Sequence, residues 1–207
     1  MIVEINETNK IERADVLDQI HVLRHKVFVE ELAWDGIQSI DGREYDEFDV
    51  SDTVYLAMLD DETGELLSTL RIQRCDRPNL TAKVFPHLVQ FMPMPSTPDI
   101  IDISRIVISP TLGKDRIGKA GWEIFSAAGD YARNNGIRAS MGIMSPHFFK
   151  RVTQGGIDVR PLGFPVGKGR DAYFAALMPV YAGGFHKELP DPNLIFGFEN
   201  PPLQRAA

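Results

Sequence analysis

The segment 100–108 limits the possible folds of this chain more than any other. It reads Ile-Ile-Asp-Ile-Ser-Arg-Ile-Val-Ile, an alternation of apolar and polar residues that predicts a central strand. A helical pattern follows and ends at Asn135 and Gly136, which form a common C-terminal signal. Another strand is predicted over 138–144. A strand, a helix and a strand in succession favour an α/β domain.

The remaining patterns add elements on both sides of this unit. Strands are predicted over 2–5, 53–59, 65–74, 157–160 and 171–178, with 53–59 and 65–74 joined as a β-hairpin. Helices are predicted from Asn9 to about Ala33, near 80–84 and over 146–154, with Asn9 and Glu12 forming a capping box. Residues 35–52 are expected to be a long loop. The predicted fold class is α/β, a single domain over 1–207 with a mixed β-sheet flanked by helices.

The charge of the chain is unevenly distributed. The net charge is −7, but residues 111–170 carry 10 basic and 4 acidic side chains, against 10 and 21 in residues 1–110. Overall acidity argues against a nucleic-acid partner, whereas the basic segment suits phosphates or an acidic protein. No apolar stretch is long enough to span a membrane, the N-terminus has no signal-peptide core, and Cys75 is the single cysteine. We therefore expect a cytoplasmic protein without membrane insertion or disulfides.

Four groups of charged residues are candidates for a functional site. In the predicted loop, Glu44, Asp46 and Asp49 alternate with aromatic residues and can hold a cation, or form a solvated acidic loop. Arg24 lies on a mostly apolar helix face, where it needs a carboxylate partner, binds a ligand carboxylate or extends to solvent. Arg71 can pair with the acidic loop.

The polar residues of strand 100–108 are the fourth group. Alternation places Asp102 and Ser104 on one face and Arg105 on the other, and a structural salt bridge would also explain them. His21 and His25 have the spacing of two metal ligands on a helix, but no third ligand is evident. We expect no metal site.

Taken in chain order, these charged and aromatic motifs resemble those of the acyl-homoserine lactone synthase family, the LuxI-type autoinducer synthases of bacterial quorum sensing. The resemblance covers about residues 1–180. Its motif residues are Leu23-Arg24, Val27-Phe28, Trp34, Glu44, Asp46, Phe48-Asp49, Leu70-Arg71, Phe85-Pro86 and Ser104-Arg105. Asp102 departs from the pattern, because the family usually has Glu before the Ser-Arg pair. Residues 181–207 lie largely outside the resemblance, and we expect this extension to pack on the domain through Phe185, Phe196 and Phe198.

The resemblance implies an acetyltransferase (GNAT)-like fold and a two-step reaction. The α-amine of S-adenosylmethionine attacks an acyl thioester of acyl carrier protein or coenzyme A, and the methionyl carboxylate then closes a lactone and releases 5′-methylthioadenosine. S-adenosylmethionine is a substrate, and no cofactor is implied. Two alternatives remain: a GNAT-like N-acyltransferase acting on another amine, and a non-catalytic sensor of S-adenosylmethionine or an acyl carrier.

The implied roles fall on particular residues. Glu44 and Asp102 are candidate bases, and Arg24 or Arg105 would bind the substrate carboxylate. Backbone N–H groups near Ser104 would face the thioester oxygen. The predicted S-adenosylmethionine site contains Arg24, Phe28, Trp34, Asp46, Asp49, Arg71 and Arg105.

The acyl carrier has its own predicted contacts. In acetyltransferase-like folds a glycine-bearing turn after the central strand binds carrier phosphate, although residues 113–118 would also suit a plain loop. The predicted phosphate contacts are Lys114, Arg116, Gly118 and Lys119. The predicted acyl pocket is lined by Met141, Met144, Phe148, Phe149 and Leu177, with Phe164 and Phe174 as weaker candidates. Met144 stands where a Thr favours 3-oxoacyl chains in this family, so we expect an acyl chain without a 3-oxo group.

Overall fold

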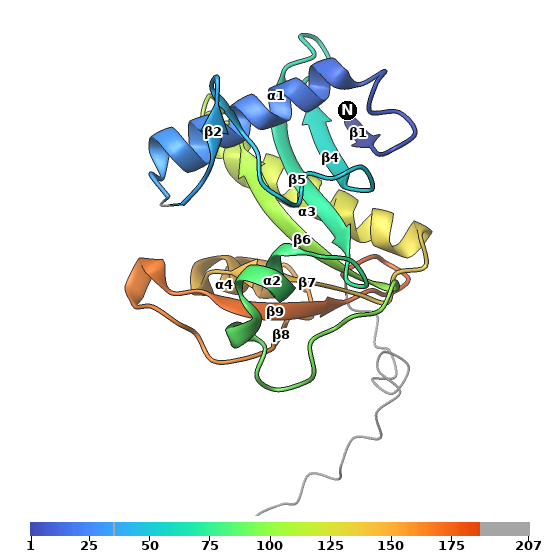
Figure 1. Cartoon of the computed structure of the whole chain (residues 1–207), viewed down its shortest axis with the longest axis vertical. Coiled ribbons are helices and arrows are strands. Elements are labelled where there is room, and N and C mark those ends of the chain that lie inside the picture. The colour runs from blue at the N-terminus through green and yellow to red at the C-terminus, as the bar shows by residue number, and fades with distance from the viewer. Residues whose placement is uncertain (35, 187–207) are drawn as a thin grey trace, which may run out of the picture.

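The structure is a computed structural model that describes residues 1–34 and 36–186, and Figure 1 shows a twisted sheet with helices around it. Seven strands form this sheet in the order β1-β4-β5-β6-β7-β9-β8. Their bounds are Ile2–Ile5 (β1), Val54–Leu59 (β4), Leu66–Arg74 (β5), Ile100–Ile108 (β6), Ala139–Met144 (β7), Arg160–Pro161 (β8) and Phe174–Pro179 (β9). The predicted mixed sheet is confirmed.

The sheet changes direction at β6 and β7. These two strands are parallel, and all other neighbouring pairs are antiparallel. A parallel connection needs a long crossover, which helix α3 (Lys114–Asn134) supplies. The pairing of β6 with β7 covers only three residue pairs, from Ile100 with Ala139 to Asp102 with Met141. Beyond Asp102 the two strands are no longer hydrogen-bonded neighbours.

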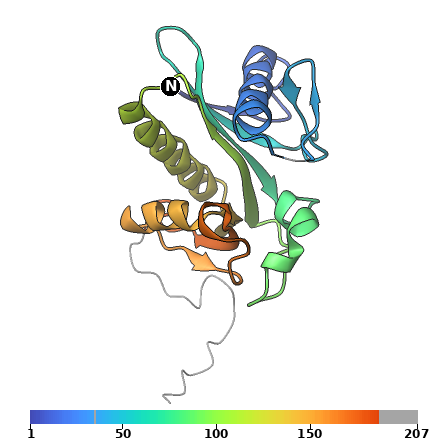
Figure 2. The same ribbon diagram turned by 90° about the vertical axis from the view of Figure 1, so that its left-hand side faces the viewer.

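Helices cover both faces of the sheet. Helix α1 (Ala14–Arg24) lies on one face and α3 on the other, as Figure 2 shows. On the α1 face, Ile20 packs with Tyr55 and Ala57 of β4. On the α3 face, Ile124 packs with Leu70 and Ile103. Helix α4 (Pro146–Gln154) joins the α3 side, and α2 (Leu80–Val84) with the 3₁₀ turn Pro86–Leu88 lies against the α1 side of β6 and β7.

Two predicted helix starts are wrong. Helix α1 begins at Ala14 after Arg13, because the side chain of Asn9 is already used by a preceding turn, where it accepts from the Asn6 N–H at 2.9 Å. Helix α3 begins at Lys114 with Gly113 as its N-cap, so residues 113–118 are not a separate glycine turn. Gly118 lies inside the helix.

The predicted loop 35–52 is also more ordered than expected. It contains a two-stranded hairpin of β2 (Ser39–Ile40) and β3 (Arg43–Glu44), and both Glu44 and Phe48 are buried. Glu44 and Phe48 thus anchor this segment to the domain, whereas Ile40 and Val50 stay exposed.

The end of the described chain packs on the domain. The Phe185 ring lies 5.3 Å from that of Phe125, and a Cβ built on Gly129 would lie 2.9 Å from the Phe185 nitrogen. Phe185 therefore packs against α3, whereas Phe196 and Phe198 lie outside the described residues. No helix among residues 1–34 and 36–186 is long and apolar enough to cross a membrane.

Gly142 allows β6 and β7 to approach each other. A Cβ built there would lie 2.5 Å from the Ile103 carbonyl oxygen. We expect Gly142→Ala to lower the free energy of unfolding by about 1–3 kcal/mol, since the extra methyl group must push backbone atoms apart. Urea denaturation measures this difference. Gly183→Ala is the control, because its added Cβ meets its nearest neighbours at 3.8 Å; equal losses in both variants would contradict the prediction.

Candidate active site

A buried network of arginines and carboxylates lies on the α1 face of the sheet. We call it the arginine–carboxylate network. Its cations come from α1, β5 and β6, and its anions come from the segment 44–49. The members are Arg24, Arg71, Arg105, Glu44, Asp46 and Asp49. Three positive and three negative charges balance one another there.

Arg24 joins two of the three carboxylates of the network. Its Nε donates to Glu44 Oε2, and its Nη1 and Nη2 donate to the two Asp49 oxygens at 2.8 and 2.9 Å. Its side chain is buried. Of the three alternatives for this arginine, the structure therefore shows carboxylate partners.

Arg71 and Arg105 complete the network from the sheet. Arg71 Nη1 donates to Asp46 at 2.5 Å and to Asp49 at 3.0 Å, which confirms its predicted pairing with the acidic segment. Its Nε donates to Ser104 Oγ at 3.1 Å. Arg105 Nη2 lies 3.0 Å from Glu44 Oε1 and 2.8 Å from Asp46 Oδ2.

A β-bulge brings Arg105 to this face. The register of β5 and β6 passes from Thr69 opposite Val107 to Arg71 opposite Ser104, so two residues of β6 oppose one of β5. Arg105 has a φ of +52° there. The predicted alternation of Ser104 and Arg105 to opposite faces is therefore wrong, because the extra residue resets the alternation.

Two aromatic rings lie beside the network. Phe28 and Trp34 are stacked with ring centroids 4.8 Å apart, and the Arg105 guanidinium carbon lies 5.6 Å from the Phe28 centroid. The π-helix His25–Glu31 continues α1, and the Trp34 N–H donates to the Phe28 carbonyl at 3.0 Å. Phe28 is buried and Trp34 is half exposed, so this stack forms a wall with one accessible side.

The two candidate bases occupy different environments. Glu44 is fully buried and each of its oxygens pairs with an arginine, Arg24 or Arg105. Asp102 is fully buried but accepts its hydrogen bonds from Thr81 of α2. Burial raises the pKa of Asp102 to about 6, although the hydrogen bonds from Thr81 and the charge of Arg71 oppose this rise.

Several neighbours of the network could not be recognised from the sequence. The Tyr55 hydroxyl donates to Asp49 Oδ1 at 2.7 Å, and Gln73 Nε2 donates to the Phe48 carbonyl at 3.0 Å. His21 Nδ1 lies 2.9 Å from the Glu44 carbonyl oxygen. Tyr55 lies opposite Arg71 in the sheet. The pairing of the two predicted hairpin strands is the one sequence signal that could have placed Tyr55 beside the network.

The histidine pair does not form a metal site in the described part of the chain. Burial, followed by the charge of Arg24, lowers the pKa of His21. His25 contacts Ser39 Oγ at 2.6 Å and Glu30 at 3.1 Å. No group of three or more metal-ligating side chains occurs among residues 1–34 and 36–186.

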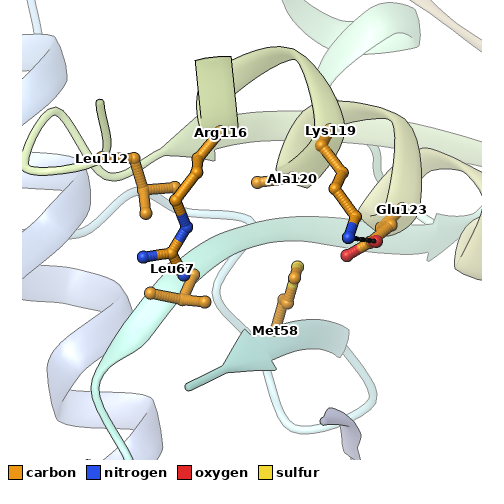
Figure 3. A pocket seen from close by; sticks show the side chains of 7 residues that line it. All are labelled: Met58, Leu67, Leu112, Arg116, Lys119, Ala120 and Glu123. Carbon is orange, nitrogen blue, oxygen red and sulfur yellow. Dashed lines mark ion pairs between the residues drawn. The ribbon is translucent and has the colours of Figure 1, made fainter. Parts of the chain in front are cut away.

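The predicted phosphate contacts lie on the other face of the sheet. Figure 3 shows Arg116 and Lys119 on α3 around a pocket of about 80 Å³, whose other lining residues are Met58, Leu67, Leu112, Ala120 and Glu123. Arg116 lies 3.7 Å from Asp60, and Lys119 lies 3.6 Å from Glu123. Gly118 is close to α4, because a Cβ built on it would lie 3.2 Å from Arg151 Nη2. The side chain of Lys114 lies outside the described residues.

The predicted acyl-pocket residues form two groups. Met141 and Leu177 pair across β7 and β9 in a cluster with Leu88, on the α1 side. Met144, Phe148 and Phe149 belong to the cluster of α3 and α4, and so does Phe174. Phe164 is 69% exposed and joins neither group. β6 and β7 are unpaired beyond Asp102 and Met141 but are still close at Ile103 and Gly142, so the two groups can line one channel only past Gly142.

Asp49 makes folding depend on pH. Burial opposes ionisation of Asp49, but hydrogen bonds and charge from Arg24, Arg71 and Tyr55 hold its pKa well below the ordinary value. The ionised group therefore stabilises the fold above about pH 4, and this contribution is lost as the pH falls below that value. We expect the free energy of unfolding to fall more steeply between pH 5 and 3 in the wild type than in Asp49→Asn.

Urea titrations at several pH values test this dependence. Asp41→Asn is the control, because Asp41 is exposed on the hairpin turn and should leave the wild-type slope intact. If the free energy of unfolding of Asp49→Asn falls with pH as steeply as that of the wild type, Asp49 is not the cause of the pH dependence.

Sequence comparison finds acyl-homoserine lactone synthases among the relatives of this chain. A profile of the autoinducer synthase family matches residues 7–187. An isovaleryl-homoserine lactone synthase of Bradyrhizobium diazoefficiens is 34% identical over 165 residues, which are 80% of this chain and 73% of the relative. An acyl-homoserine-lactone synthase of Pseudomonas aeruginosa is 27% identical over 165 residues, 79% of this chain and 81% of the relative.

Solved structures share the fold. The CoA-dependent acyl-homoserine lactone synthase BjaI, with S-adenosylmethionine and isopentyl-CoA, has a TM-score of 0.80 at 31% identity and covers 89% of this chain and 85% of its own. A Lactobacillus plantarum protein assigned as an N-acetyltransferase has a TM-score of 0.58 at 15% identity. The match covers 87% of this chain and 98% of that protein. The predicted acetyltransferase-like fold is confirmed.

Proposed function

The chain belongs to the autoinducer synthase family and is an acyl-homoserine-lactone synthase, and from this premise we propose which substrates it joins and which residues act. It makes a quorum-sensing signal from S-adenosylmethionine. In the proposed reaction the methionyl amine forms an amide bond with the acyl carbon, and the thiolate of the carrier leaves. The methionyl carboxylate then bonds its own γ-carbon, and 5′-methylthioadenosine leaves with the electrons of the broken C–S bond.

The arginine–carboxylate network beside the Phe28–Trp34 stack is the observation that carries this proposal. S-adenosylmethionine has a carboxylate, an ammonium and a sulfonium, so its site needs charges of both signs. Arg105 is the favoured carboxylate ligand, because it is 11% exposed beside Phe28 while Arg24 is enclosed by Glu44 and Asp49. Asp46, 16% exposed, is favoured for the sulfonium. Arg24 and Arg71 hold the carboxylates in place.

Asp102 is the favoured general base. The ammonium must lose a proton, directly or through a water molecule, before its nitrogen can attack. Both oxygens of Glu44 already accept hydrogen bonds from arginines, whereas Asp102 has Thr81 as its partner and, among the described residues, no arginine on its oxygens. The backbone N–H groups at the β-bulge of Arg105 are the favoured donors to the thioester oxygen, since a bulge leaves a residue unpaired in the ladder.

We favour a coenzyme A thioester with a short acyl chain as the donor. The 34% identical relative is an isovaleryl-homoserine lactone synthase, and BjaI is CoA-dependent. We place the channel between β6 and β7, where the bulky side chains of Met141 and Met144 favour a short chain. Lys150 and Arg151, exposed on α4, would contact the donor's phosphates or an acidic carrier. Arg116 and Lys119 face the hairpin β4–β5, which makes them weaker candidates.

The test is incubation of the protein with S-adenosylmethionine and a panel of acyl-CoA and acyl-carrier-protein thioesters, followed by mass spectrometry. We expect an acyl-homoserine lactone and an equal amount of 5′-methylthioadenosine, with short branched acyl-CoA preferred. An acylated amine without 5′-methylthioadenosine would show a general N-acyltransferase instead. Binding of S-adenosylmethionine without turnover of any donor would favour the sensor.

Met144 tests the proposed absence of a 3-oxo group. We expect Met144→Thr to raise the preference for 3-oxoacyl over plain acyl donors by about 2- to 10-fold, the effect of one added hydrogen bond. The ratio of the two kcat/KM values measures this preference and cancels losses of folded protein. Met178→Thr, another buried methionine of the same cluster, should leave the ratio unchanged. An unchanged ratio in Met144→Thr would contradict the proposal.

A further inference from the structure

Thr81 is joined to Asp102 by two hydrogen bonds. Its backbone N–H donates to Asp102 Oδ2 at 2.9 Å, and its hydroxyl donates to Oδ1 at 3.0 Å. Both side chains are fully buried. Thr81 lies in the first turn of α2, which Asn79 caps by accepting from the Ala82 N–H. The residue thus holds both carboxylate oxygens from a fixed helix turn.

The surroundings of Asp102 make this contact important. Asp102 stands opposite Gln73 on one side and Met141 on the other, at the last paired position of β6 and β7. The amide nitrogen of Gln73 donates its hydrogen bond to the Phe48 carbonyl and not to Asp102. Among the described residues, no arginine or lysine forms an ion pair with Asp102 within 4 Å. Thr81 therefore supplies the hydrogen bonds that orient this carboxylate.

We propose that Thr81 is a positioning residue for the acyl transfer, which holds Asp102 in the plane and ionisation state needed to take a proton from the substrate amine. This inference rests on the proposed function of Asp102. With both oxygens held by Thr81, the carboxylate cannot rotate, so its remaining lone pairs keep one direction. Hydrogen bonds to the ionised form also favour that form over the acid.

The groups that act on Asp102 determine the expected pH dependence. Arg71 faces it from β5 and favours its ionised form, as do the amides of Leu80 and Thr81 on α2. Cys75, which follows β5, is buried, and its thiol has a raised pKa, partly because of Asp102. Loss of the Thr81 hydroxyl removes one stabilising partner of the carboxylate. The acidic limb of the kcat/KM profile should then move to higher pH.

Two substitutions separate positioning from packing. Thr81→Val keeps the shape and the backbone N–H but loses the hydroxyl, and Thr81→Ser keeps both donors but loses the methyl group. We expect Thr81→Val to lower kcat at least about tenfold, with the KM for S-adenosylmethionine within about threefold and the acidic limb moved upward. Thr81→Ser should retain most of the activity. If Thr81→Val is more active than Thr81→Ser, the methyl group of Thr81 matters for packing, and the inference is wrong.

A double-mutant cycle completes the test. If Thr81 acts through Asp102, Thr81→Val should lower the residual rate of Asp102→Asn by less than about twofold. A full tenfold loss in that background would overturn the inference. Lactone formation by the wild type is measured in the same experiment, so its absence would refute the proposed function and not the role of Thr81 alone. Circular dichroism of each variant confirms that it is folded.

Discussion

Arg24→Ala is expected to lower the free energy of unfolding by about 3–5 kcal/mol, the typical effect of removing one partner from a buried ion pair. The substitution leaves Glu44 and Asp49 buried with fewer partners, because three of the Arg24 nitrogens donate to them. The side chains of Glu44 and Asp49 are 0% and 6% exposed, so little water can replace the lost hydrogen bonds. Urea denaturation at pH 7 measures the loss.

Arg43→Ala is the matched control for this prediction. Arg43 also donates two hydrogen bonds to one aspartate, Asp18, but both side chains are more than a third exposed. Its removal should cost much less stability than that of Arg24, because water replaces an exposed partner. Losses of similar size in Arg24→Ala and Arg43→Ala would show that burial is not what makes the network important.

Asp102→Asn is expected to lower kcat/KM by about 10²- to 10⁴-fold, the usual contribution of a general base. The KM for S-adenosylmethionine should change little, since the proposed binding contacts lie in the arginine–carboxylate network. The pKa of Asp102 is raised to about 6, so the wild-type rate should fall as the pH decreases through 6 and the base becomes protonated. The variant should lose this acidic limb.

Two further variants make this result specific. Asp76→Asn changes an exposed aspartate that pairs with Arg74 nearby, and it should keep the wild-type profile. Glu44→Gln should mainly reduce stability and binding of S-adenosylmethionine, because Glu44 joins Arg24 to Arg105. If instead Glu44→Gln removes the acidic limb and Asp102→Asn retains it, Glu44 is the base.

Local pattern explains why many elements could be predicted. Alternation located β4, β5, β6 and β7 within a residue or two, and Pro146 with Gly155 marked the ends of α4. The predicted start of α1 was wrong because a short polar side chain can either cap a helix or accept a hydrogen bond within a turn. Asn9 fits a helix cap in sequence, but in the structure it closes the preceding turn.

The amino-acid sequence by itself determined the order of strands and helices and the identity of the charged residues. Arg24 and Arg71 on otherwise apolar elements required carboxylates, and the segment 44–49 was the acidic stretch at hand. Local spacing and the cost of burying an unpaired charge are enough for that inference. The same reasoning gave no position in space for any of these groups.

Tertiary structure alone decided which side chains meet. The bulge that turns Arg105 toward Glu44, 61 residues away in sequence, follows from the register of β6 against β5. The contact of Thr81 with Asp102 needs α2 to pack on β6. Register and packing depend on contacts distant along the chain, so no local pattern could specify them.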